Sequence, residues 1–419
     1  MWLLAQVLDR RRPLDEALEQ ALAPGGRMTS LAGRDRAFAR LLVSTVLRRL
    51  GQLDDAIGRC LDRPLNHRGE VARNTLRLAA AQLLLLDTPA HAAVDTAVRQ
   101  VARWPGLKGL VNAVGRRLAR EGAAPLAVQD DERLNCPAWL WQSWAAAYGE
   151  TDTRAIVAAL LAEPPLDLTV RRDPAAWAER LQAELLPTGS LRRRDGGAVS
   201  ELPGYAEGAW WVQDAAAALP ARLLPASAGQ RVIDLCAAPG GKTAQMAAAG
   251  AAVTAVDLSA ARLRRLTDNL QRIGLSADTV AADATDWRPA EPADAVLLDA
   301  PCTSTGTIRR HPDIWHLKTA ADVAAVTPLQ DRLLAAATDM LRPGGTLVYC
   351  VCSLQLEEGP ARIARLLQSG APVRRRPLQA AELNGLVELI DAAGDLRTLP
   401  HQLGGLDGFY ACRLERQGD

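Results

Sequence analysis

The chain has 419 residues, which is too long for one ordinary hydrophobic core, so two or three domains are expected. It contains no apolar run of about 18 residues and no signal-peptide pattern, so we expect neither membrane insertion nor export. Seven cysteines are few, odd in number and without disulfide-like spacing, which predicts a reducing, cytoplasmic location with thiols available for chemistry.

The net charge of +1 conceals an uneven distribution along the chain. Residues 1–130 contain 20 Lys and Arg against 13 Asp and Glu, a net charge of +7, and the remainder contains 29 against 35, a net charge of −6. A basic part on an acidic body indicates an anionic partner, although a solvated helical surface is equally compatible with so modest a charge. The one Cys-x-Cys sequence has only His311 and His316 nearby, so no metal site is predicted.

Residues 1–125 show the helical period throughout, with no alternating strand pattern, and predict an all-α bundle of six or seven helices. Several arginines recur near helix ends and would suit phosphate contacts: Arg34, Arg36, Arg40, Arg48, Arg49, Arg116, Arg117 and Arg120. Within this part, residues 76–120, with their HAAV and VNA sequences, resemble the NusB-type helical domain. This resemblance implies RNA binding; Gly115 stands where that family usually has a large apolar residue.

Residues 126–205 are predicted to form a linker and a small α+β subdomain. The linker leads into a helix whose Trp139, Trp141 and Trp144 are interpreted as core anchors. A strand at residues 166–171 and a helix at residues 174–185 follow. The arginines at 192–194 could face RNA or water, and the sequence does not choose between these alternatives.

Residues 206–419 alternate strands with helices, which predicts a doubly wound, mainly parallel sheet. Helices are expected at residues 259–273 and 321–341. The expected strands lie at residues 231–236, 252–257, 279–283, 295–299, 346–352 and 409–414.

The sequence RVIDLCAAPGGKTAQMAAAG (231–250) reads as a strand, a glycine-rich turn and a helix. It lacks the G-x-G-x-x-G of a dinucleotide loop, and Cys236 stands where a P-loop needs its first glycine. An S-adenosylmethionine (SAM) loop remains, in which glycines allow close approach of the backbone to the cofactor. Three successive strands then end near Asp257, Asp283 and Asp299, a pattern that favours a nucleoside-type ligand. Asp234 is interpreted as orienting the loop.

Two cysteines are expected beside this loop. In GTLVYCVCS (345–353), strand alternation puts Thr346, Val348, Cys350 and Cys352 on one face, with Cys352 at the carboxyl end. Cys302 follows the end of the preceding strand. A thiolate that adds to C6 of a pyrimidine makes C5 nucleophilic enough to attack a sulfonium methyl group, and elimination then regenerates the thiol. Spacing alone leaves open which thiol attacks.

Together, DLCAAPGGKT, DAPCTSTG and YCVCS resemble the RNA cytosine-5 methyltransferases, and RRHPDIW with the NusB-like part narrows the likeness to the small-subunit (16S) rRNA methyltransferase B (Fmu/Sun) type. The resemblance implies a Rossmann-like SAM domain, small-subunit rRNA as partner, Cys352 as nucleophile and Cys302 as the group that assists product release. A monomer is expected. Cys350 is expected to pack or hydrogen-bond. Asp299 and Lys242 complete the predicted catalytic set. Predicted cofactor contacts are Cys236, Ala237, Ala238, Pro239, Gly240, Gly241, Lys242, Asp257, Arg262, Asp283 and Asp299.

Two other functions stay open at this stage. One is an RNA-binding assembly or antitermination factor whose SAM fold has lost catalysis, and the other is a tRNA cytosine-5 methyltransferase. The glycine loop, the acids and both thiols argue for catalysis, and the nature of the RNA would separate the two enzymes.

Overall fold

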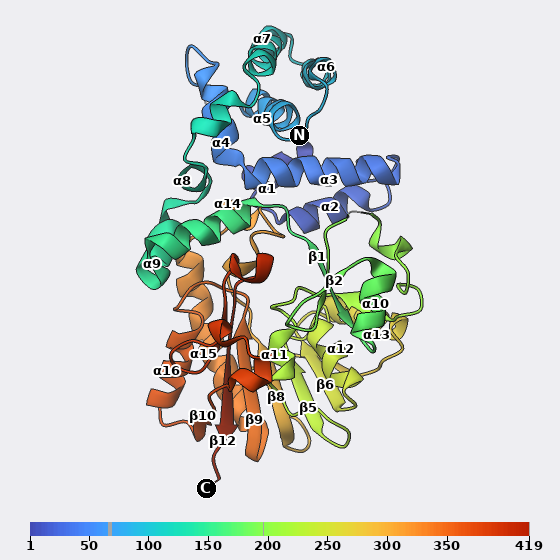
Figure 1. Ribbon diagram of the computed structural model, residues 1–419, viewed down its shortest axis with the longest axis vertical. Coiled ribbons are helices and arrows are strands. Elements are labelled where there is room, and N and C mark those ends of the chain that lie inside the picture. Colours follow the sequence, from blue (N-terminus) through green and yellow to red (C-terminus); the bar gives the residue numbers. More distant parts are fainter. Residues whose placement is uncertain (66–68, 196, 419) are drawn as a thin grey trace. The chain divides into compact units, whose positions relative to one another are not determined.

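The computed structural model describes residues 1–65, 69–195 and 197–418 (Figure 1). The chain divides into two compact units. The helical unit comprises Met1–Ala162 with Ile308–Thr319, and the sheet unit comprises Glu163–Thr307 with Ala320–Asp419. Each unit is described by itself.

The helical unit begins with the bundle that the helical period predicts. Its apolar stripes meet in one core, in which Leu4, Leu53 and Leu76 are fully buried. The helices are α1 (Trp2–Leu8), α2 (Leu14–Leu22), α3 (Gly33–Arg48), α4 (Leu50–Arg59), α5 (Glu70–Leu84), α6 (Ala90–Gln100), α7 (Pro105–Glu121), α8 (Asp131–Asn135), α9 (Ala138–Leu161) and α14 (Ile314–Leu317).

Helix α14 comes from a distant part of the sequence, yet it belongs to the helical unit. The ring of Trp315 lies 6.0 Å from that of Trp144, which is fully buried, as predicted for a core anchor. Asp313 accepts a hydrogen bond from the backbone N–H of Leu14 at 3.0 Å, and a ring nitrogen of His316 lies 2.8 Å from the carbonyl oxygen of Leu47. Nothing in the sequence pattern predicted this placement.

The sheet unit contains a small antiparallel sheet with the strand order β2-β3-β1-β4. Arg192 in this sheet faces neither RNA nor water, because it is 1% exposed and donates two hydrogen bonds of 2.7 Å to Asp167. The elements are β1 (Leu166–Val170), α10 (Pro174–Leu181), β2 (Glu184–Leu185), β3 (Leu191–Arg193) and β4 (Trp210–Val212).

The large sheet has the strand order β10-β12-β9-β8-β5-β6-β7, with β11 paired to β12. The strands from β9 to β7 are parallel, and β12 runs antiparallel to β9, β10 and β11. The prediction of a mainly parallel sheet is confirmed. The strands are β5 (Arg231–Leu235), β6 (Ala252–Asp257), β7 (Asp278–Ala281), β8 (Ala293–Asp299), β9 (Leu341–Val351), β10 (Val373–Arg375), β11 (Leu396–Thr398) and β12 (Phe409–Arg416).

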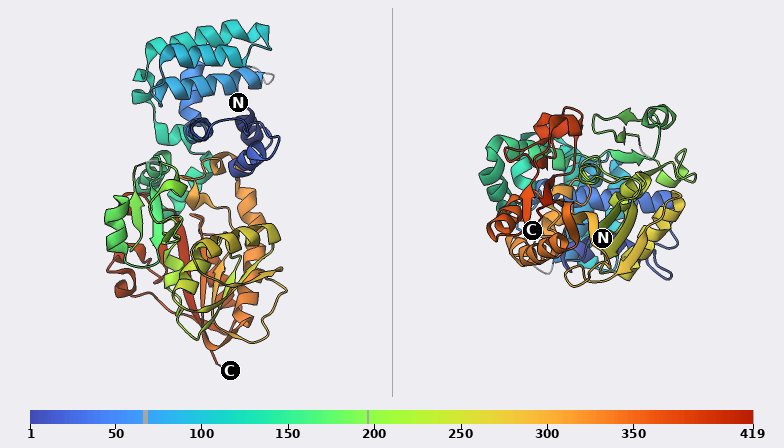
Figure 2. Two further views of the ribbon diagram at one scale, coloured as in Figure 1. Left: turned by 90° about the vertical axis from the view of Figure 1, so that its right-hand side faces the viewer. Right: turned by 90° about the horizontal axis from the view of Figure 1, so that it is seen from below.

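Helices cover both faces of this sheet, as Figures 1 and 2 show. Strand β9 separates two cores: Leu347, Tyr349 and Val351 pack with α15 and α16, and Val348 and Cys350 pack on the opposite face with α11. This is the alternation expected of a strand buried on both sides. The helices are α11 (Leu219–Arg222), α12 (Gly241–Ala248), α13 (Ala260–Arg272), α15 (Ala320–Asp339) and α16 (Pro360–Gln368).

Strand β9 begins earlier than predicted. Its pairing with β8 starts at Leu341 opposite Ala293 and resumes at Thr346 opposite Ala295. The Pro-Gly-Gly sequence (343–345) lies between these points, so it forms an irregularity within the strand. Gly344, at φ +72°, has the backbone freedom that this excursion needs.

Candidate active site

The glycine-rich loop between β5 and α12 is shaped by two residues with positive φ, Cys236 at +60° and Gly240 at +100°. A Cβ atom at Gly240 would lie 2.7 Å from Leu266 Cγ, so no other residue fits there without a shift of α13. Asp234 is fully buried and accepts a hydrogen bond of 2.6 Å from Thr243, and burial raises its pKa to about 7. Asp234 therefore fastens α12 to β5, which matches its predicted orienting role.

A cavity of 430 Å³ lies beyond the carboxyl ends of the parallel strands. It brings together eight predicted site residues: Cys236, Ala238, Asp257, Arg262, Asp283, Asp299, Cys302 and Cys352. The predicted contacts Ala237, Pro239, Gly240, Gly241 and Lys242 are not among the residues that line it. Since Gly240 packs against α13, its contribution is the shape of the loop.

Apolar walls complete this cavity, and they were not predicted from the sequence. Leu329 and Leu333 of α15 form one wall, and Leu258, which is 76% exposed, follows directly after Asp257. A large apolar residue directly after a strand-end acid is the one sequence signal that could have pointed to Leu258. Nothing in the helical period of α15 singled out Leu329 and Leu333, because both belong to its ordinary apolar stripe.

Asp257 and Asp283, two of the three acids near strand ends, differ in their surroundings. Asp257 is 3% exposed; it accepts hydrogen bonds from the backbone N–H groups of Ala238 at 3.2 Å and Ser259 at 2.9 Å, and it pairs with Arg262 at 3.5 Å. Asp283 is exposed, and hydrogen bonds from the backbone and hydroxyl of Thr285 lower its pKa. Both carboxylates thus keep acceptor capacity toward the cavity.

Asp299 lines the cavity with its side chain 32% exposed and contacts two more deeply buried groups, Lys242 and Cys350. Lys242 donates to it at 2.7 Å, and Cys350 lies at hydrogen-bond distance from its other oxygen, 3.4 Å away. Burial alone would lower the pKa of Lys242, but the charge of Asp299 raises it above its ordinary value. The ammonium also lies 5.1 Å from the centre of the Phe409 ring. Cys350 is fully buried, and burial raises the pKa of its thiol, in keeping with its predicted packing role.

The two remaining thiols meet at the edge of the cavity. Cys352 directly follows β9, Cys302 follows β8, and their Sγ atoms are 3.5 Å apart because these strands are neighbours. The hydrogen bond from Cys302 lowers the pKa of Cys352 and raises that of Cys302 well above its ordinary value. Ser304, whose backbone has φ +59°, puts its hydroxyl oxygen 3.5 Å from Cys352 Sγ. This arrangement favours one thiolate, on Cys352, beside one protonated thiol.

These residues fit a nucleoside-bearing methyl donor. The volume of 430 Å³ lies in the range of small-molecule sites. Carboxylates at two strand ends can accept hydrogen bonds from ribose hydroxyls and a base amino group, and the leucine walls suit the face of a purine. Among the described residues, no cluster of His, Cys, Asp and Glu could hold a metal ion.

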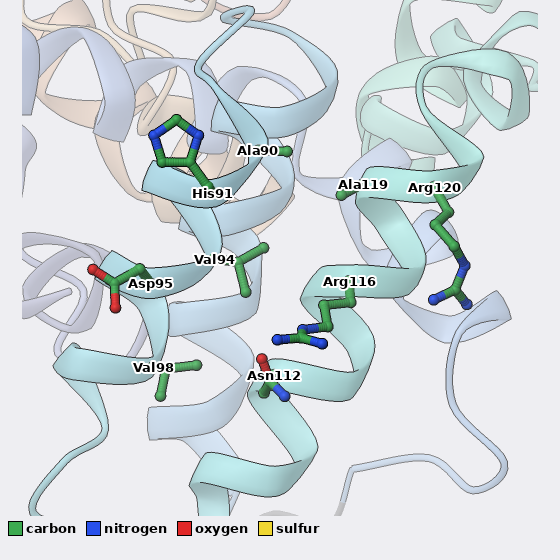
Figure 3. A pocket seen from close by; sticks show the side chains of 9 residues that line it. All are labelled: Ala90, His91, Val94, Asp95, Val98, Asn112, Arg116, Ala119 and Arg120. Atoms are coloured by element: carbon green, nitrogen blue, oxygen red, sulfur yellow. The ribbon is translucent and has the colours of Figure 1, made fainter.

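A second hollow, of 540 Å³, lies in the helical unit between α6 and α7, and we call it the α6–α7 groove (Figure 3). Val94, Val98 and Ala119 supply apolar lining, and Arg116 points from α7 into the gap. Gly115 is buried beneath it, where an added Cβ would lie 3.3 Å from Val94 Cγ2. The glycine therefore allows α6 and α7 to pack closely.

The structure distinguishes among the arginines predicted to contact phosphate. Most of them already bind other groups of the protein. Two donate to backbone carbonyls: Arg36 to those of Leu31 and Thr29, and the buried Arg48 to that of Arg309. Three form ion pairs: Arg40 with Asp15, Arg49 with Asp131 and Arg117 with Glu121. Arg116 and Arg120, which line the α6–α7 groove, are exposed and form no ion pair with any carboxylate of the described residues.

The doubly wound sheet, the glycine loop and the acids around one strand-end cavity define a Rossmann-like, SAM-dependent methyltransferase domain, joined here to a helical domain. The family described as 16S rRNA methyltransferase RsmB/F matches residues 221–415, and the NusB family matches residues 2–120. The chain belongs to this methyltransferase family and carries a NusB domain. No helix of the described residues is long and apolar enough to cross a membrane.

Individual relatives cover almost the whole chain. It is 35% identical to ribosomal RNA small subunit methyltransferase B of Vibrio cholerae, over 99% of this chain and 96% of the relative. The protein of that name from Pseudomonas putida is 37% identical, over 98% of this chain and 96% of its own. The crystal structure of PH0851 has the same fold, with a TM-score of 0.77 at 23% identity, covering 99% of this chain and 97% of that one.

Proposed function

We propose that this protein is a monomeric, cytoplasmic enzyme that methylates C5 of a cytosine in 16S rRNA through a transient bond between Cys352 and C6. The observation that carries the proposal is the pair of thiols 3.5 Å apart at the edge of the cavity. The names of its relatives support small-subunit rRNA as the substrate.

The two thiols divide the work in this proposal. Cys352 adds to C6 as the thiolate, because the hydrogen bond from Cys302 lowers its pKa. SAM, when bound, supplies the electrophilic methyl group that C5 takes up. Once Cys352 is bonded to C6, its negative charge no longer faces Cys302, so the thiol of Cys302 can release its proton to solvent. The Cys302 thiolate then accepts the proton from C5, the bond between Cys352 and C6 breaks, and its electron pair returns to Cys352.

The acids hold the two reactants in place. Asp257 and Asp283 bind the nucleoside part of SAM, with Arg262 keeping Asp257 in position through their ion pair. Asp299 lines the same cavity as the thiols, and Lys242 holds its carboxylate in position through a hydrogen bond of 2.7 Å. Its carboxylate accepts a hydrogen bond from the ring N3–H once N3 has taken a proton from solvent, and this stabilises the protonated ring to whose C6 the thiolate adds.

The helical unit supplies RNA affinity in this proposal. Arg116 and Arg120, without carboxylate partners among the described residues, bind backbone phosphates along the α6–α7 groove. The net charge of +7 over residues 1–130 supports the same role.

Transfer of a tritiated methyl group from SAM to unmodified small-subunit rRNA tests the proposal, followed by mapping of 5-methylcytosine. Naked rRNA and assembling small-subunit particles serve as parallel substrates, and tRNA serves as the control. Label at carbon 5 of an rRNA cytosine is the expected result. Label confined to tRNA, label on another atom, or no transfer to either rRNA substrate would contradict the proposal.

A further inference from the structure

A buried carboxylate lies directly behind the two thiols, and the mechanism described above does not use it. Glu358 is 0% exposed and occupies the turn between Ser353 and α16. No Lys or Arg of the described residues forms an ion pair with it. Burial raises the pKa of its carboxyl group. Burying such a group is unfavourable unless hydrogen bonds satisfy it, so its partners show what it holds.

Those partners come from both thiol-bearing segments. One carboxylate oxygen of Glu358 accepts the backbone N–H of Thr303 at 2.8 Å. The other accepts the hydroxyl of Thr303 at 2.7 Å and also the hydroxyl of Ser353. Thr303 is the residue after Cys302, and Ser353 is the residue after Cys352. One carboxylate therefore joins the two chain segments one residue away from each sulfur atom.

The turn that contains Glu358 does not need this carboxylate for its own shape. Local hydrogen bonds already close it, from the backbone N–H of Glu358 to the Gln355 carbonyl at 3.2 Å and from that of Gln355 to Ser353 Oγ at 3.1 Å. Tyr349 adds a hydrogen bond of 2.5 Å to the carbonyl of Glu358. The side chain can thus connect the segments on either side of the thiols.

Backbone contacts alone leave freedom at the thiols. The N–H of Ala300 donates to the Cys350 carbonyl at 2.9 Å, and that of Gly306 donates to the Cys352 carbonyl at 3.0 Å. Residues 301–305 span the interval between these bonds, and Cys302 lies within it. Gln330 donates to the Pro301 carbonyl at 2.9 Å near one end of this interval, and the N–H of Leu354 donates to Thr305 Oγ1 at 3.0 Å at the other. The bonds from Thr303 to Glu358 hold its middle, next to Cys302.

We propose that Glu358 is a positioning residue whose carboxylate holds the Cys302 segment against the Cys352 strand end and thereby sets the distance between the two thiols. This role rests on the proposed two-thiol reaction. It assigns Thr303 and Ser353 as the donors through which Glu358 acts, and it requires no contact between Glu358 and the RNA or SAM.

Glu358→Gln tests this inference, because it keeps the size of the side chain but replaces one acceptor oxygen with a donor. Glu357→Gln is the matched control, since Glu357 is the exposed neighbour. We expect kcat to fall about 10- to 100-fold, since a misplacement of about 1 Å can cost a factor of 10². KM for RNA and the SAM dissociation constant should stay within about twofold of the wild type, because Glu358 touches neither ligand.

A second readout follows the distance between the thiols without any methyl transfer. Phenylarsine oxide bridges two adjacent thiols with loss of water, so it should bind tightly across Cys302 and Cys352 in the wild type and in Glu357→Gln. Binding should be weaker in Glu358→Gln. Cys302→Ala and Cys352→Ala define the background from other cysteines. This readout tests the positioning role even if the wild type fails to methylate rRNA, so the two proposals can fail separately.

Thr303→Val and Ser353→Ala, which each remove one hydroxyl donor, provide the test if Glu358→Gln does not fold. Each should lower kcat and arsenical binding and leave SAM binding intact. Wild-type kcat and arsenical binding in Glu358→Gln would overturn the inference. Loss of SAM binding in parallel with kcat would overturn it as well, because Glu358 would then support the fold as a whole.

Discussion

The strand ends that carry Cys302 and Cys352 and the groove between α6 and α7 use polar groups in opposite ways. In the sheet unit, the polar groups behind the thiols are buried and bound to one another; Glu358 alone takes hydrogen bonds from three donors. In the helical unit, Arg116 and Arg120 are exposed and have no carboxylate partner among the described residues. The buried groups fix the positions of the two thiols, and the exposed arginines present positive charge to solvent.

This contrast determines how each region should respond to change. A buried, mutually bonded site fails as a unit when one member is removed, because the remaining groups lose their positions or their partners. Exposed charges act nearly independently, and salt screens them. Substitutions at the thiols should therefore have large effects, and substitutions in the groove should have small, additive ones.

The largest effect is expected for Cys352→Ala. Removing the nucleophile should lower methyl transfer at least about 10³-fold, because no other group can make the bond to C6. Calorimetry should show that SAM still binds. Cys350→Ser is the control: it lies on the same face of β9, and its hydroxyl can take over the contact with Asp299. Full activity in Cys352→Ala would remove the assigned nucleophile.

Cys302→Ala should have the next largest effect. Without a base for the C5 proton, turnover should fall by about 10² to 10⁴, the range that acid–base groups contribute. The methylated RNA should remain bonded to Cys352. A band of reduced mobility on denaturing gels, seen only with both RNA and SAM, is the expected measurement. If no such band forms while turnover falls, Cys302 acts before the methyl transfer and not after it.

The pH dependence of thiol alkylation should reveal the coupling between the two sulfur atoms. The pKa of Cys352 lies below the ordinary value, so iodoacetamide should modify it at a pH where an ordinary thiol is still protonated. Cys302→Ala removes the hydrogen-bond donor, so the alkylation profile of Cys352 should shift to higher pH. Cys236, whose pKa burial raises to about 12, should stay unmodified and serve as an internal reference. An unchanged profile in Cys302→Ala would show that the thiols do not interact.

The sequence predicted several of the residues that line the strand-end cavity, because parallel strands impose a simple rule. Residues at the carboxyl ends of neighbouring strands must meet, so the strand pattern was enough to assign Asp257, Asp299, Cys302 and Cys352 to one cavity. The alternation along β9 put Cys350 on the same face as Cys352, and the structure separates the two by depth, because Cys350 is fully buried within the strand and Cys352 follows its end. Where a residue lies in or at the end of a regular strand, its spacing in the sequence determines where its side chain lies.

Prediction from the sequence failed where contacts between distant segments determine the position of a residue. The arginine run at 192–194 left two alternatives open, and the answer for Arg192 was a third, a buried pair with Asp167, which lies 25 residues away in the sequence. Residues 308–319 follow the Cys302 segment, yet they belong to the helical unit. No sequence pattern pointed to Glu358, because a Glu in a turn is usually solvated. Such choices depend on which segments meet across long separations, and no local period encodes that.

The smallest effect is expected in the groove. Arg116→Gln with Arg120→Gln should weaken binding of rRNA by about tenfold at moderate salt and flatten the dependence of log K on log salt by about one for each phosphate that is no longer neutralised. Filter binding over a salt series measures both quantities. Arg117→Gln is the matched control, because Arg117 already pairs with Glu121 on the same helix. kcat at saturating RNA should not change, since the groove adds affinity and no chemistry. An unchanged salt slope in the double variant would show that the groove does not contact the RNA backbone. A fall in kcat would show that the helical unit affects the chemical step as well as the affinity for RNA.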